Sequence, residues 1–197
     1  FFTFQKYGKG YAKIKRNMFA YRFEKTKKRL IKLKYVKENN LTTKGEFSSQ
    51  IYADEILIGE IFATDFYIKL NEYQILMILA CICYESREKT EFYEEYPSDL
   101  LNQLKKALMK NSYTNKEHRF NDLDPLTSLI DPCFHNKSIF DIMENTNLLE
   151  GDLIRFFRQL LDRINQIKKA TKDERLRQIL ISCRDLIFNC LMDIDTV

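Results

Sequence analysis

The sequence predicts an all-α fold, a bundle of about six to eight helices. Its 197 residues contain only 5 Gly and 3 Pro, which leaves long stretches without helix-breaking residues. Within these stretches apolar residues recur with the 3.6-residue period of a helix, and strand-like alternation is rare. The longest uncharged apolar run, Ile75–Tyr84, is far shorter than the roughly 20 residues that a membrane span needs. We therefore expect no membrane partner.

Residues 1–17 mix Lys, Gly and Tyr without a clear period, and we interpret them as a basic arm or linker. From Phe1 to Lys44 there are 14 Lys and Arg against 2 Asp and Glu, a net charge of +12, whereas the rest of the chain carries −8. This asymmetry favours a polyanion-facing N-terminal segment. An alternative is an arm that contacts nucleic acid, with cations on phosphates and tyrosines stacked on bases.

Residues 18–53 are predicted to be the C-terminal half of a winged-helix domain. A basic helix over Met18–Leu33 precedes a short extended piece, an Asn39-Asn40 turn and a second extended piece at Leu41–Thr43. A helix followed by a small hairpin is how such a domain ends, and the helices that should come before it are absent from this sequence. Three cations of the helix are candidate nucleic-acid contacts: Lys27, Lys28 and Arg29.

Residues 54–197 are predicted to form the helical bundle. Leu70–Tyr84 is its most apolar stretch and should be the central helix. Ser98 and Asp99 can cap a helix that runs to Lys110, and Ser138–Met143 is a short helix. The last helix is expected over Asp173–Asp193.

The segment Leu148–Ala170 organises the prediction. Its apolar stripe contains five residues, with Asp152 as a plausible N-cap: Leu153, Phe157, Leu160, Ile164 and Ile167. On the opposite line of the helical wheel lie four polar residues: Arg155, Gln159, Asp162 and Gln166. The apolar stripe should face the core. The polar line is either an ordinary solvated face or the wall of a groove that binds a ligand.

Catalytic and metal-binding patterns are mostly missing. The sequence has no P-loop, dinucleotide-binding fingerprint, nucleophile elbow or zinc-protease motif. Its five Cys lie mostly in apolar runs and lack the usual zinc spacings, so we interpret them as core thiols. The N-terminus lacks a signal-peptide pattern, and we expect a reduced, cytoplasmic environment.

Binding is the remaining kind of function. Ser138–Arg163 resembles a helix-turn-helix in which Arg155, Arg158 and Arg163 lie on the second helix. It is also consistent with two packed helices joined by a turn, which are common in any bundle.

Four segments, in order, are similar to the C-terminal part of the Ski–Mtr–HelY group of superfamily-2 DExH RNA helicases. Phe23–Val36 (FEKTKKRLIKLKYV) resembles the end of the family's winged-helix domain. The other three resemble parts of the helical bundle that follows: Leu41–Phe62 (LTTKGEFSSQIYADEILIGEIF), Ile78–Arg87 (ILACICYESR) and Glu150–Ile167 (EGDLIRFFRQLLDRINQI).

The resemblance implies that the chain is the C-terminal, non-catalytic module of an ATP-dependent RNA helicase. Its bundle, the DSHCT domain, would guide single-stranded RNA with a ratchet-like helix at residues 152–167. The ATPase domains of the same polypeptide would be its partners, and they, not this fragment, would hold ATP and Mg²⁺. Arg155 and Asp162 match a basic and an acidic position of the family, whereas Gln159 departs from the Arg of eukaryotic members.

Two alternatives to this function remain open. One is a helix-turn-helix DNA-binding regulator, which predicts a dimer and sequence-specific duplex binding. The other is a helical protein-interaction scaffold, which predicts that charge reversal of the basic helix leaves strand binding unchanged. The residues predicted to bind nucleic acid are Arg155, Arg158, Gln159, Asp162, Gln166, Lys27, Lys28 and Arg29.

Overall fold

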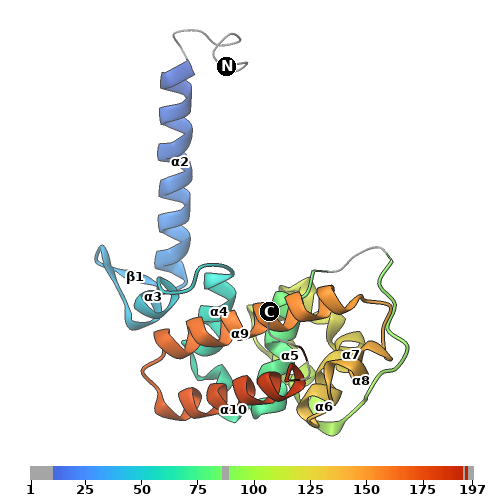
Figure 1. The fold of residues 1–197 in the computed structure, drawn as a ribbon. Coiled ribbons are helices and arrows are strands. Elements are labelled where there is room, and N and C mark those ends of the chain that lie inside the picture. Colours follow the sequence, from blue (N-terminus) through green and yellow to red (C-terminus); the bar gives the residue numbers. More distant parts are fainter. Residues whose placement is uncertain (1–10, 86–88, 193, 195–197) are drawn as a thin grey trace. The chain divides into compact units, whose positions relative to one another are not determined.

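The computed structural model describes residues 11–85, 89–192 and 194. The chain forms two compact units, Phe1–Glu46 and Phe47–Val197. Helices dominate both, and one small hairpin is the only named sheet of the described residues (Figure 1). The predicted all-α fold with a small β-hairpin is confirmed. The winged-helix assignment and the three predicted domain limits stay predictions.

The first unit contains α2 (Tyr11–Lys32), β1 (Val36–Lys37) and β2 (Asn40–Leu41). The strands are antiparallel, with Val36 opposite Leu41. Glu38 and Asn39 form the turn with φ of 51° and 65°, the left-handed values that a tight two-residue hairpin turn requires. The turn therefore lies one residue before the predicted Asn39-Asn40. Of the predicted basic arm, residues 1–10 lie outside the described residues, whereas residues 11–17 are helical.

The start of α3 (Thr43–Ser48) packs closely on Tyr35, the residue just before the hairpin. A Cβ on Gly45 would lie 2.2 Å from the carbonyl oxygen of Tyr35, so only glycine fits at this position. The Tyr35 ring is buried, and the Lys44 ammonium lies 4.5 Å from its centroid. These contacts attach the hairpin to the helix that follows it.

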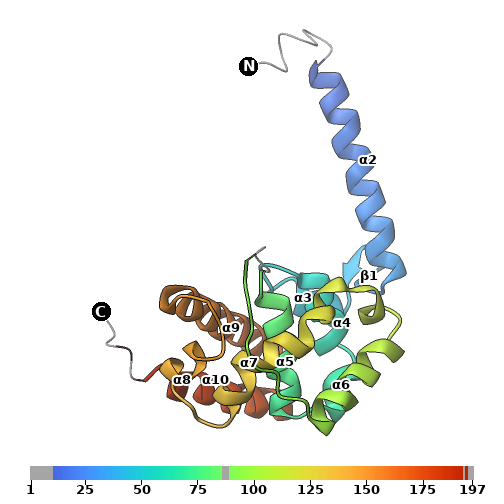
Figure 2. The ribbon, with the colours of Figure 1, turned by 90° about the vertical axis from the view of Figure 1, so that its right-hand side faces the viewer.

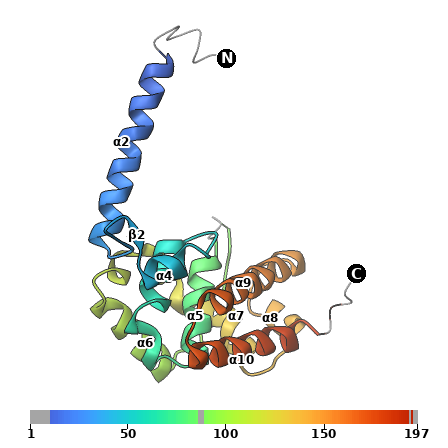
Figure 3. The same cartoon turned by 90° about the vertical axis from the view of Figure 1, so that its left-hand side faces the viewer.

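The second unit is a bundle around α5 (Glu72–Cys83), in which every side chain from Ile75 to Ala80 is fully buried. Figures 2 and 3 show α5 among helices that pack on it from several sides. The remaining elements are α4 (Glu55–Phe62), η2 (Asp65–Lys69), α6 (Asp99–Lys110), η3 (Thr114–Lys116), η4 (His118–Asp122), α7 (Leu123–Phe134), α8 (Ile139–Met143), α9 (Glu150–Ala170) and α10 (Glu174–Cys190). The predicted central helix is confirmed, because α5 contacts α6, α7, α9 and α10.

Helix caps follow the sequence in most places. The Ser98 hydroxyl accepts the Leu101 N–H at 3.2 Å and begins α6 as predicted. Asn71 and Gln74 form a reciprocal capping box at α5. The predicted N-cap of α9 is wrong: the helix begins at Glu150, and Asp152 lies in its first turn. The Leu149 carbonyl already accepts the Leu153 N–H at 3.1 Å, so the backbone starts the helix without a capping side chain.

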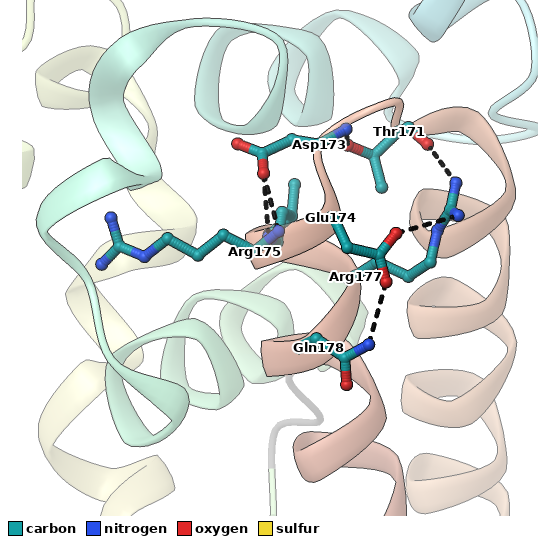
Figure 4. Close-up of polar contacts among 7 residues, drawn as sticks. Thr171, Asp173, Glu174, Arg175, Arg177 and Gln178 are labelled. Carbon is teal, nitrogen blue, oxygen red and sulfur yellow. Dashed lines mark hydrogen bonds and ion pairs between the residues drawn. The ribbon is translucent and has the colours of Figure 1, made fainter.

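The turn between α9 and α10 is held by side chains at and near the start of α10 (Figure 4). The Asp173 carboxylate accepts the backbone N–H of Arg175 at 2.8 Å and so caps α10. Arg177 donates to the Thr171 carbonyl at 2.9 Å, and Glu174 accepts from Arg177 on one side and Gln178 on the other. The Tyr67 hydroxyl donates to the second carboxylate oxygen of Asp173. The two long helices therefore lie side by side in a fixed arrangement.

The apolar stripe predicted for α9 is confirmed, since all five of its side chains are fully buried. The five cysteines are free and buried, as predicted for core thiols. No described helix is both long enough and apolar enough to cross a membrane.

Candidate functional site

A groove of about 710 Å³ runs along the polar face of α9. Its second wall comes from the end of α5 and the two residues after it, from the loop before α4, and from η4. The lining residues are Ala53, Asp54, Ile82, Cys83, Tyr84, Glu85, Arg119, Gly151, Ile154, Arg155, Arg158, Gln159, Asp162 and Arg163.

Helical periodicity places the α9 side chains in this groove. Arg155, Gln159 and Asp162 are separated by four and three residues, so they follow one line along the helix. Arg158 lies one turn after Arg155 and widens this line. On the other side of α9, the buried Phe157 and Leu160 fix the rotation of the helix. The predicted polar line therefore does line a groove at three of its four positions.

The groove is rich in arginine, and its cations are engaged to different extents. Arg119 forms a 2.8 Å ion pair with Asp54 and also donates to the Ile82 carbonyl at 3.2 Å. Arg155 is 3.9 Å from the Glu85 carboxylate, and their side chains are 60% and 80% exposed. An ion pair that is so long and so exposed contributes little. Arg155 is therefore much easier to recruit to a ligand than Arg119.

Arg158 is the most available cation of this wall. Its side chain is exposed and lines the groove. Within the described ranges, it makes no hydrogen bond or ion pair with another residue. An exposed guanidinium next to Arg155 suits an oxyanion such as phosphate.

Gln166, the fourth residue of the predicted polar line, does not face the groove. It is only 8% exposed, so the prediction that it faces water is wrong. Its side-chain oxygen accepts the Tyr52 N–H at 3.1 Å, and its nitrogen donates to the Asp162 carboxylate at 2.6 Å. The physical reason is that the loop before α4 covers this end of α9, and a buried amide must find partners there.

Arg163 lines the groove and also holds the loop of the facing wall. One guanidinium nitrogen donates to the Ala53 carbonyl at 2.7 Å. Arg163 also lies near the thiol of Cys83, where burial raises the pKa to about 11 and the nearby guanidinium partly opposes this shift. The thiol therefore stays protonated at neutral pH and acts as a neutral part of the wall. In the helix-turn-helix interpretation Arg163 would contact DNA, but its side chain is half-buried and holds a loop.

The remaining predicted residues lie in the first unit. Lys28 and Arg29 are exposed on α2, and Lys27 is half-buried. Their role in binding stays a prediction. The structure brings Arg155, Arg158, Gln159 and Asp162 together in the groove.

Sequence reasoning missed the opposite wall of the groove. Asp54, Glu85 and Arg119 come from the loop before α4, the segment just after α5 and the 3-10 helix η4, which are distant in the sequence. No local period marks these residues, because only the packing of α5 against α9 and η4 brings them together. One residue of this wall, Glu85, could have been noticed in the sequence, because it is the first charged residue after the apolar run Ile75–Tyr84.

The groove does not fit a magnesium nucleotide. Two of its carboxylates, Asp54 and Glu85, face arginines. Over the described ranges, no three His, Cys, Asp or Glu side chains gather in a way that suits a metal ion. This set of donors suits an anionic strand rather than a divalent cation.

Comparison with known proteins gives two findings. The model of the DSHCT (NUC185) domain matches residues 38–189, which include the whole bundle from α4 to α9 and nearly all of α10. The chain is also 27% identical over 169 residues to the ATP-dependent RNA helicase mtr4 of Schizosaccharomyces pombe (strain 972 / ATCC 24843). That match covers 76% of this chain but only 15% of the relative. The cations of α2 lie before the family match, and the groove lies within it.

Proposed function

Because the chain belongs to the DSHCT (NUC185) domain family, we propose that it is a non-catalytic module of an ATP-dependent RNA helicase and that its α9 groove guides single-stranded RNA. ATP hydrolysis would take place in other domains of the same polypeptide. The relative is named as an ATP-dependent RNA helicase, and this chain corresponds to a small part of its length.

The observation that carries the proposal is the pair of available arginines on one wall of the groove. Arg158 is exposed, and Arg155 makes only a long, exposed contact with Glu85. Both can neutralise phosphates without first breaking a strong ion pair. Two phosphate contacts on a single strand predict a slope of about −1.4 for the logarithm of affinity against the logarithm of salt concentration.

The other polar groups of the groove suit a strand that has to move. Gln159 offers an amide, and Asp162 offers a carboxylate, to base edges of any sequence. The acidic Asp54, Glu85 and Asp162 oppose the four arginines, so the net positive charge of the lining is small. Weak binding that does not depend on sequence permits translocation, whereas tight base-specific contacts would stop it.

The experiment is a binding titration of the full 197-residue chain with a fluorescein-labelled oligouridylate, followed by anisotropy at low salt. Arg158→Glu should weaken binding about tenfold, since it loses an attraction and adds a repulsion. The matched control is Lys106→Glu, the same charge reversal on the exposed face of α6. Equal affinities for Arg158→Glu and Lys106→Glu would reject the groove as the RNA site.

A second titration, with duplex DNA, distinguishes the proposed function from its main alternative, a DNA-binding regulator. A helix-turn-helix regulator would bind one duplex sequence preferentially and as a dimer. The module proposed here should prefer the single strand and show little dependence on base sequence.

A further inference from the structure

Tyr52 presents an aromatic ring to solvent beside the groove. Its side chain is 88% exposed, the highest fraction among the large hydrophobic side chains that the structure describes. The residue before it, Ile51, is 5% exposed and anchors the chain in the core. The next two residues, Ala53 and Asp54, line the groove. Tyr52 therefore directly precedes the groove lining, and its ring is exposed to solvent.

Three side chains hold the backbone that carries this ring. Gln166 accepts the Tyr52 N–H at 3.1 Å, and Arg163 donates to the Ala53 carbonyl at 2.7 Å. Arg119 binds the Asp54 carboxylate at 2.8 Å. Two of these three residues belong to α9, the helix that forms the other wall of the groove.

Asp54 itself adopts an unusual backbone conformation. Its φ of 56° and ψ of 29° are left-handed, which costs energy for a residue other than glycine. Its carboxylate makes no capping hydrogen bond at α4 and instead engages Arg119. The contacts of Asp54 and its neighbours are thus sufficient to hold a strained turn in place.

We propose that Tyr52 is a stacking platform for a base of the single-stranded RNA in the α9 groove. This proposal rests on the proposed function. Every base has a flat face, so stacking on a tyrosine adds affinity without sequence preference. The anchored backbone means that little backbone entropy is lost when a base packs on the ring. The arginines would hold phosphates while the ring holds a base at the groove's edge.

The test compares substitutions of Tyr52 on two ligands: an oligouridylate and a base-free ribose-phosphate strand of the same length. Tyr52→Phe keeps the flat ring and should bind the oligouridylate within about twofold of the wild type. Tyr52→Ala should weaken that binding about fivefold or more. On the base-free strand, all three proteins should bind equally. Phe140→Ala, which removes an exposed ring from α8, is the matched control and should change neither affinity.

The outcomes separate this inference from the function on which it rests. If Arg158→Glu weakens binding but Tyr52→Ala does not, the groove binds RNA and the stacking role is wrong. An equal loss on both ligands for Tyr52→Ala also overturns stacking, because it shows a general effect on the loop. If Arg158→Glu has no effect, or the full chain binds no RNA, the proposed function fails first and the stacking role fails with it. Unchanged thermal unfolding midpoints show that the variants remain folded.

Discussion

Gln166 donates its side-chain amide to the carboxylate of Asp162 across one turn of α9, with 2.6 Å between nitrogen and oxygen. The donor is buried and the acceptor is exposed in the groove. Because the oxygen of the same amide accepts the Tyr52 N–H, one side chain fixes both a groove carboxylate and the loop of the opposite wall. Gln166 therefore organises the groove and does not line it.

Gln166→Ala should lower the free energy of unfolding by about 1–3 kcal/mol. The substitution leaves the Tyr52 N–H without its acceptor and removes a buried side chain, and a buried unsatisfied group is costly. Urea unfolding at pH 7 measures the change. Gln178→Ala is the control, because its amide bonds Glu174 on the exposed face of α10 and its loss should cost under about 0.5 kcal/mol. Similar losses at both positions would contradict the role given to Gln166.

Asp162→Asn should strengthen binding of an oligouridylate about two- to fivefold at low salt. Asp162 is an exposed carboxylate in the groove, so its charge repels phosphates, and screening by water keeps that repulsion small. Asparagine can still accept the Gln166 amide. Anisotropy titration measures the change, which should disappear at high salt. Weaker binding by Asp162→Asn would contradict this prediction, because it would show that hydrogen bonds from base edges to the carboxylate outweigh its repulsion of phosphates.

The contact between Tyr67 and Asp173 should make the free energy of unfolding depend on pH in the alkaline range. Burial and hydrogen bonding to the Asp173 carboxylate raise the pKa of Tyr67 to about 12. The folded state therefore holds this proton more tightly than the unfolded state does, and the resulting stability is fully present below pH 10. It is lost as pH rises from about 10 through about 12.

The measurement is the difference in unfolding free energy between the wild type and Tyr67→Phe, from urea unfolding at pH 8 and at pH 11. The stability of the wild type relative to Tyr67→Phe should fall as pH rises, because the wild type loses the Tyr67 proton and phenylalanine has none to lose. The comparison cancels other tyrosines that also titrate, such as Tyr73, whose pKa burial raises to about 12. A difference in unfolding free energy that does not change with pH would contradict the predicted role of the Tyr67 hydroxyl.

Periodicity was enough to predict α9 and its buried stripe, because an amphipathic helix in a bundle has one rotation that hides its apolar side chains. Capping chemistry located the start of α6 at Ser98 for a similarly local reason. The start of α9 was misplaced because its first turn is completed by the backbone of Leu149, which has no sequence signature. These successes and errors all concern contacts within a few residues of the chain.

The exposure of Gln166 and the second wall of the groove required the tertiary structure. A helical wheel shows which residues share a line, but it does not show that a loop 114 residues earlier covers one end of that line. Arg119 and Asp54 form their ion pair only after η4 and the loop before α4 have packed in the bundle. A polar residue at the edge of an apolar stripe can therefore be either exposed or buried, and the sequence alone does not decide which.

The central claim is that an RNA strand lies along α9, and photochemical crosslinking tests it most directly. The full chain is bound to an oligouridylate that contains 4-thiouridine, irradiated, digested and mapped by mass spectrometry. The account predicts crosslinks to peptides that carry residues 151–163 of α9 and residues 52–54 of the facing loop, and their loss in Arg158→Glu. Crosslinks confined to α2, or spread over the surface and unchanged in the variant, would contradict it.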